Sequence, residues 1–182
     1  MKKSVLIAAG LVLLYVAVAS AEVVKEHYLN GNVKSEQAYT NGTLDGASKW
    51  YYKNGSLQLE ENYAKGDIEG ASRVYYENGT LKAELFYRAG QLHGVCKSYY
   101  KSGSLLEEVH YADGKQEGLS KAYLESGALK IEARFKGGRL NGNIKVYHPN
   151  GKVQYQDTYA DGVRVERRQY DENGKLIDPE KK

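Results

Sequence analysis

A 24-residue repeat runs through nearly the whole of this 182-residue chain. Glycine recurs at three positions of the repeat, and these positions hold 17 of the 20 glycines. Tyrosine recurs at three further positions. A fixed period between about 20 and 50 residues is typical of stacked arrays, in which each unit buries its surface against its neighbours. The chain is therefore predicted to form one extended array of similar units.

Each unit is predicted to be a β-hairpin. Tyr and β-branched residues fill runs of about seven residues, a composition that favours strands. A short step ending in glycine separates two such runs, and a tight turn needs the positive φ that glycine adopts readily. These steps are Asn54-Gly55, Asn78-Gly79, Ser102-Gly103 and Asn150-Gly151. The predicted fold class is all-β, an elongated open antiparallel sheet of stacked hairpins without an α-helix after residue 22.

A two-residue turn at each glycine step sets the pairing of the strands. Position 53 then faces position 56, which places Tyr52 opposite Leu57 and Lys49 opposite Glu60. The later units repeat this pairing as Arg73 with Glu84, Lys97 with Glu108, Lys121 with Glu132, and Lys145 with Gln156. Cross-strand ion pairs contribute about 0.2 to 1 kcal/mol each. We therefore interpret them mainly as markers of register, with an ionic binding stripe as the alternative.

Alternation along the strands separates two faces. The face predicted to be packed carries Trp50, Tyr52, Leu57, Leu59 and Tyr63. The same pairing places Tyr63 across from Gly46, Tyr87 across from Gly70, and Tyr111 across from Gly94. Aromatic rings often cover glycines in curved sheets, and we expect these rings to do so.

The opposite face is predicted to carry the charge pairs and a row of tyrosines. Tyr combines apolar area with a polar tip, a combination enriched at protein interfaces. We expect this row to bind a partner. Its members are Tyr51, Tyr75, Tyr99, Tyr123 and Tyr147. The alternative is that the rings stack on one another and only stabilise the sheet.

The first 21 residues have a composition of their own. Lys2 and Lys3 precede an apolar run from Val5 to Ala19, and small residues follow up to Ala21. This three-part pattern is typical of a secretory signal peptide, which is helical before cleavage, and predicts export to the periplasm or the exterior. The alternative is an uncleaved membrane anchor formed by residues 5–21. The remaining chain divides into repeats over residues 22–176 and a charged tail over residues 177–182.

The composition and the repeat predict a protein without catalytic or cofactor chemistry. The four histidines, His27, His93, His110 and His148, do not gather at one repeat position, so we expect no metal site. The single cysteine, Cys96, takes the repeat position of Ser48, Ser72 and Ser120, and we expect it to be a small packed side chain. Residues 22–182 hold 24 Lys and Arg against 23 Asp and Glu. Nucleic acid needs a concentrated basic face, so we do not expect it as a partner.

The segment "YTNGTLDGASKWYYKNGSLQLEENY", residues 39–63, resembles the bacterial variant of the MORN repeat. The resemblance extends from about Tyr28 to Leu176. The resemblance implies an exported scaffold that contacts other proteins or lipid through an open curved sheet. Some proteins of this family are described as antitoxin-like. The last unit departs from the pattern, because Glu166 replaces a glycine and Gly174 comes one residue early.

Two classes of function remain. The first is an exported, non-catalytic scaffold that binds a protein partner, such as a toxin or an envelope protein, through one face of the sheet. The alternative is a structural protein associated with the membrane or the cell wall, in which the aromatic face meets lipid or glycan and the N-terminal segment stays as an anchor.

Overall fold

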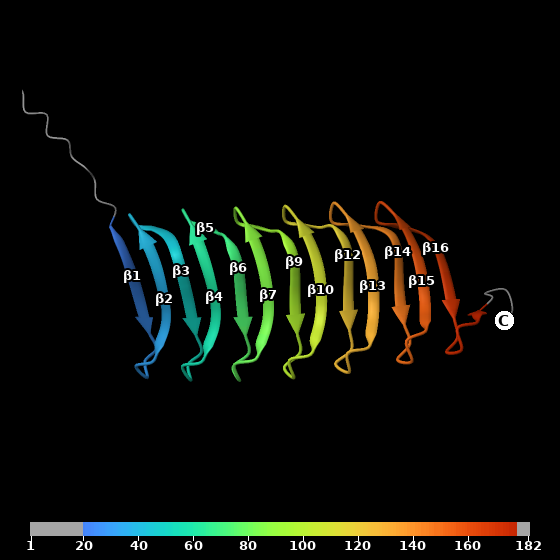
Figure 1. Cartoon of the computed structure of the whole chain (residues 1–182), viewed down its shortest axis with the longest axis horizontal. Coiled ribbons are helices and arrows are strands. Elements are labelled where there is room, and N and C mark those ends of the chain that lie inside the picture. Colours follow the sequence, from blue (N-terminus) through green and yellow to red (C-terminus); the bar gives the residue numbers. More distant parts are fainter. Residues whose placement is uncertain (1–19, 178–182) are drawn as a thin grey trace, which may run out of the picture.

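The computed structural model describes residues 20–177 of the chain, and these residues form one antiparallel sheet of 17 strands (Figure 1). Every pairing joins strands that are one or two places apart along the chain, so the sheet grows from β1 to β17 without crossing connections. No helix occurs in the described residues, which confirms the predicted all-β class. The predicted signal segment lies outside them, except for Ser20 and Ala21.

The strands have the following bounds: β1 Ala21–His27, β2 Val33–Thr40, β3 Thr43–Tyr51, β4 Leu57–Ala64, β5 Asp67–Ile68, β6 Gly70–Tyr75, β7 Leu81–Arg88, β8 Gln91–Leu92, β9 Gly94–Tyr99, β10 Leu105–Ala112, β11 Lys115–Gln116, β12 Gly118–Tyr123, β13 Leu129–Lys136, β14 Arg139–Tyr147, β15 Val153–Ala160, β16 Val163–Tyr170 and β17 Leu176–Ile177. The two-residue strands β5, β8 and β11 directly precede β6, β9 and β12.

The strands are joined differently at the two edges of the array. The sequence predicted the two-residue turns at one edge, and the structure has them at the other. Two-residue turns with positive φ at both positions join strands at Asn41-Gly42 and its equivalents, which we call the turn end. The Asn54-Gly55 step instead lies in a five-residue loop, residues 52–56, closed by hydrogen bonds between the backbones of Tyr52 and Ser56 and of Gly55 and Tyr52. We call this the loop end.

The charge pairing was nevertheless predicted correctly, and a bulge explains why. Leu57 pairs with Tyr51 and not with Tyr52 as predicted, and the next pair is Trp50 with Leu59. Gln58 is therefore an extra residue in β4, which makes a β-bulge. The longer loop and the extra residue offset each other, and Lys49 still faces Glu60. The other four predicted pairs are also found: Arg73 with Glu84, Lys97 with Glu108, Lys121 with Glu132, and Lys145 with Gln156.

The glycine column that includes Gly46 is required by backbone conformation. Gly46 pairs with Tyr63 as predicted, and the equivalent pairs follow in later units. The expectation that the ring covers the glycine stays a prediction, because a Cβ built at Gly46 points to the opposite face, where it meets Ala38 at 3.2 Å. Gly46 and Gly70 have φ of 108° and 82°, which side chains with a Cβ rarely adopt. Positive φ therefore explains why glycine recurs at this position.

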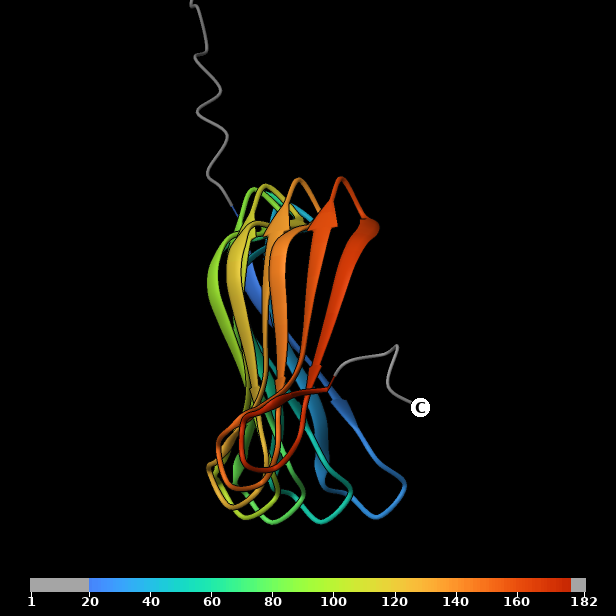
Figure 2. The same cartoon turned by 90° about the vertical axis from the view of Figure 1, so that its right-hand side faces the viewer.

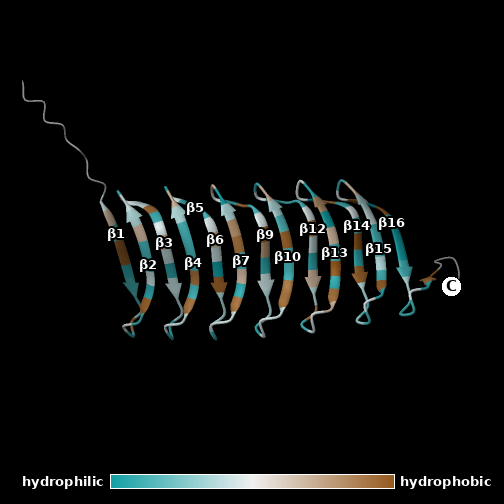
Figure 3. Cartoon of the chain, in the orientation of Figure 1, coloured by the Kyte–Doolittle hydropathy of each residue, from teal (hydrophilic) through white to brown (hydrophobic). Residues whose placement is uncertain are grey.

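The sheet is a single curved layer (Figure 2), and apolar and polar residues alternate along its strands (Figure 3). On the packed face, Trp50, Leu59 and Tyr63 keep their predicted places. Tyr52 and Leu57 do not, because Tyr52 lies in the loop and Leu57 pairs with Tyr51. The centre of this face holds small, buried side chains. They are Ser48, Ser72, Cys96, Ser120, Val109 and Ala133.

Neighbouring units are joined at the loop end by a repeated side-chain hydrogen bond, which we call the tyrosine staple. Tyr52 donates from its hydroxyl to the backbone carbonyl oxygen of Tyr75 at 2.7 Å. Tyr28, Tyr76 and Tyr100 make the same bond to the next unit. Leu124 occupies this position in the following unit and has no hydroxyl. In the last unit His148 takes over, with its Nε2 3.2 Å from the carbonyl oxygen of Tyr170.

Candidate interaction surface

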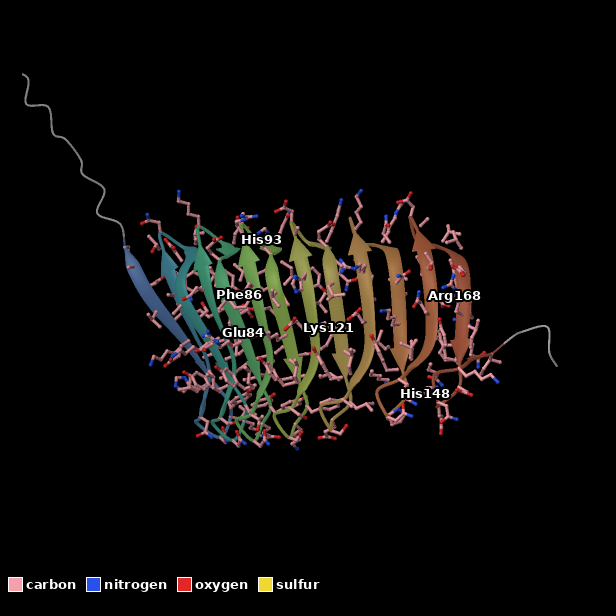
Figure 4. The ribbon with its side chains drawn as sticks, turned by 45° about the vertical axis from the view of Figure 1, so that its right-hand side comes forward. Glu84, Phe86, His93, Lys121, His148 and Arg168 are labelled. Carbon is pink, nitrogen blue, oxygen red and sulfur yellow. The ribbon has the colours of Figure 1, made fainter. Side chains whose placement is uncertain are left out.

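The face opposite the packed one carries an unbroken row of charged residues across the strands, which we call the charge row. Each acidic member pairs directly with a basic residue on both sides: Glu60 lies between Lys49 and Arg73. The row runs Lys25, Glu36, Lys49, Glu60, Arg73, Glu84, Lys97, Glu108, Lys121, Glu132, Lys145, Gln156, Arg168. Figure 4 labels three members, Glu84, Lys121 and Arg168.

Ion pairs form within the row where the side chains converge. Arg73 donates from Nε to Glu84 at 2.8 Å and from Nη1 to Glu60 at 3.4 Å, and so joins two units. Lys97 Nζ lies 3.7 Å from Glu108. Because these side chains are partly exposed, each pair adds at most about 1 kcal/mol. The row marks the register of the long strand pairs and contributes little to stability.

The predicted tyrosine row lies on this face beside the charge row, towards the loop end. Tyr75 donates from its hydroxyl to Glu60 Oε1 at 3.0 Å, and Tyr51 donates to Glu36 Oε2 at 3.0 Å. Burial, followed by the hydrogen bond to the carboxylate, raises the pKa of both phenols. The first two tyrosines of the row therefore each bond a carboxylate of the charge row.

The other predicted members, Tyr99, Tyr123 and Tyr147, are half-buried and occupy the same position in later units. Burial, and then the nearby Glu132 carboxylate, raises the pKa of Tyr147. Each tyrosine of the row pairs directly with an aliphatic residue at the start of the next strand, and directly paired residues share a face. These partners are Leu57, Leu81, Leu105, Leu129 and Val153. The structure thus brings all five predicted residues into one aromatic and aliphatic stripe.

A shallow hollow of about 110 Å³ interrupts the face near its N-terminal end. Its lining includes Ala47 and Ala71 together with Lys49, Glu60 and Arg73 of the charge row. The small alanine side chains explain the hollow, since later units carry Val95 and Leu119 at the same repeat position. A hollow of this volume has room only for a small chemical group of a bound molecule.

Cys96 and His93 lie apart from this surface, whereas His110 lies on it, with its Nε2 3.8 Å from Oε1 of Glu108 in the charge row. Cys96 is 4% exposed on the packed face, and burial raises the pKa of its thiol, so it is a packed residue as predicted. His93 lies at the turn end, where its Nδ1 accepts from Arg88 at 2.8 Å. Among residues 20–177, no group of three or more His, Cys, Asp or Glu side chains could hold a metal ion.

Sequence reasoning missed two features of this surface. The charge pairs were found within hairpins, but their continuation between hairpins needs the antiparallel neighbours that only the fold supplies. The staple tyrosines were placed on the packed face because the turn was misassigned. A signal was available, since the one polar substitution at that position, His148, keeps a nitrogen able to donate a hydrogen bond.

No helix in the described part of the chain is long and apolar enough to cross a membrane. No curated protein matches the chain. The model of a repeat family, the MORN repeat variant, matches residues 44–65, 68–89, 92–113 and 140–161. The unmatched interval between the last two segments contains Leu124, where the tyrosine staple is missing. The chain is a repeat scaffold that carries four matches to the MORN repeat variant, arranged as stacked hairpins in an open sheet.

Proposed function

We propose that the chain is an exported, non-catalytic scaffold that binds a protein partner through the tyrosine row and the adjacent charge row. The observation that carries this proposal is the single-layered sheet. Every strand contacts its neighbours within the sheet, and no helix or second sheet among residues 20–177 covers the face with the tyrosine row. An open face with an aromatic stripe is typical of a binding surface.

The charge row supports the same proposal through specificity. Its alternating signs give no broad field that would attract polyanions. They do give a fixed pattern that a partner must match in position, since like charges brought together cost free energy. The aromatic stripe supplies the apolar area for binding, and the charge row supplies the orientation.

Export is part of the proposal and rests on the composition of residues 1–21. Lys2, Lys3 and the apolar run that follows are typical of a signal peptide. Intact-mass measurement of the protein from its native cells tests this step. A mass corresponding to residues 22–182 supports cleavage, and a mass that includes residues 1–21 contradicts it.

The binding surface is tested with the double variant Tyr99→Ser and Tyr123→Ser. Their side chains make no ion pair or hydrogen bond in the described structure, and their backbone carbonyl oxygens can still accept the staples after substitution, so we expect the melting temperature to change little. Capture of partner proteins from the native envelope fraction, identified by mass spectrometry, is expected to be lost. A matched control is Tyr100→Phe, which removes the staple hydroxyl beside Tyr99. This control should lower stability and leave the captured set unchanged.

Two results would contradict the proposal. If the double variant captures the same proteins as the wild type, the tyrosine row does not bind them. If it unfolds at a much lower temperature, the row is structural, as Tyr75 with its bond to Glu60 already is.

A further inference from the structure

The charge row has one position where the expected acid is absent. Five units place Glu between two basic residues, and the sixth places Gln156 between Lys145 and Arg168. Gln156 is half-buried and pairs directly with both basic residues. Glutamine has nearly the shape of glutamate without its charge. The two cations therefore flank a position that carries no negative charge.

The end of the sheet around Gln156 is also the basic part of the chain. Residues 129–170, which form β13 to β16, contain nine Lys and Arg against four Asp and Glu. Residues 21–128 contain 12 Lys and Arg against 15 Asp and Glu. The near neutrality of the whole chain thus conceals an acidic N-terminal part and a basic C-terminal end. The missing acid adds to the positive charge of that end.

We propose that the position at Gln156 receives an acidic side chain, Asp or Glu, from the protein partner. This inference rests on the proposed function and assigns one contact of that surface. The partner's carboxylate would lie over Gln156 and take the place that Glu holds in the other units. Lys145 and Arg168 would donate charge-assisted hydrogen bonds to it from either side.

The surroundings favour a single carboxylate over a polyanion. Arg168 already donates from Nε to Glu166 at 2.7 Å, and Glu132 pairs with Lys145 on its other side. These acids flank the two cations and confine the positive potential to about two strand spacings, roughly 10 Å. Nucleic acids and anionic bilayers bind best to broad basic surfaces. Tyr147 lies two residues from Lys145 on the same face, so a partner on the tyrosine row would reach this position.

The test uses the full chain and a fluorescein-labelled peptide of six Glu-Gly repeats, with a Gln-Gly peptide as control. Fluorescence anisotropy at low salt measures the dissociation constant. We expect Gln156→Glu to weaken binding of the acidic peptide about fivefold or more, the size of one surface ion pair with added repulsion. Lys145→Gln, which removes a cation without adding an anion, should weaken binding in the same direction.

Gln169→Glu is the matched control, because it adds the same charge to the same end on the opposite face. It should change binding of the peptide by less than about twofold. The fold of Gln156→Glu is checked by circular dichroism, and its melting temperature should be unchanged or higher because the variant completes the charge row.

Three results with the peptides would overturn the inference. They are equal binding of the acidic peptide by wild type and Gln156→Glu, equal binding of the two peptides by wild type, and weakening by Gln169→Glu as large as that by Gln156→Glu. Binding of anionic phospholipid vesicles that exceeds peptide binding and is insensitive to Gln156→Glu would also overturn it. If Gln156→Glu still captures the envelope proteins that the Tyr99 and Tyr123 variant loses, this inference fails and the proposed function stands.

Discussion

The hydroxyl of Tyr76 donates a 2.8 Å hydrogen bond to the backbone carbonyl oxygen of Tyr99, 23 residues further along the chain. The bond connects the loop of one unit to the end of a strand in the next. Hydrogen bonds of this kind contribute about 1 kcal/mol each, and the bond recurs at nearly every junction between units.

Removing one staple should therefore lower stability, and adding the missing one should raise it. We expect Tyr100→Phe to reduce the free energy of unfolding by about 1 kcal/mol, since the carbonyl oxygen of Tyr123 loses its partner. Leu124→Tyr should increase it by about 0.5 to 1 kcal/mol by supplying a bond to Tyr147. Urea unfolding of both variants measures the two changes. A Leu124→Tyr variant less stable than wild type would show that the unit around Leu124 cannot accept the staple.

The buried serines of the packed face give a second prediction. Ser72 Oγ donates to Glu61 Oε1 at 3.0 Å. Ser48 is 0% exposed, and its hydroxyl has no partner among the described residues. A buried polar group without a partner costs free energy, whereas a bonded one contributes to stability. We expect Ser72→Ala to destabilise by about 1 kcal/mol and Ser48→Ala to be neutral or stabilising.

Thermal or urea unfolding of these two alanine variants decides the matter, and each serves as the control for the other. Equal losses of stability would mean that both hydroxyls are satisfied to the same degree in solution.

The C-terminal end gives a prediction about pH. Asp157 is 6% exposed and accepts two hydrogen bonds from Arg167, at 2.8 and 2.7 Å. The bonds from Arg167 lower the pKa of Asp157 below its usual value of 3.8. A lowered pKa in the folded state stabilises the fold at pH values above the unfolded pKa. This stabilisation is lost as pH falls from about 4 through the folded pKa.

Asp157→Asn should accordingly be less stable than wild type at pH 7, by about 1 to 3 kcal/mol, because Arg167 loses its charged partner. The difference should shrink as pH falls below about 4, where the wild-type carboxyl becomes protonated. Melting temperatures of both proteins between pH 2.5 and 7 test this dependence. A difference that stays constant over that range would show that the charge of Asp157 does not stabilise the fold.

The fold class and the charge pairing could be predicted from the sequence, because both depend on the period of the repeat and on the alternation of side chains along the strands. The pairing of Lys49 with Glu60 was found from an incorrect turn, since the five-residue loop and the extra residue Gln58 offset each other. The conformation of the loop could not be deduced in this way. The step Asn54-Gly55 suits a two-residue turn, and it equally suits a five-residue loop that is followed by a bulge. The side-chain partners of Tyr52 and Tyr75 could not be predicted either, because they depend on the spacing between hairpins.

The missing staple at Leu124 bears on how the array responds to force. A load along the long axis of the sheet is carried in series by the junctions between units, so the whole array is only as strong as its weakest junction. The junctions of Tyr28, Tyr52, Tyr76 and Tyr100 share one design, and the junction of Leu124 lacks one of its bonds. When the array is stretched, it should open first between β13 and β14, the two strands whose hairpins a staple at position 124 would join.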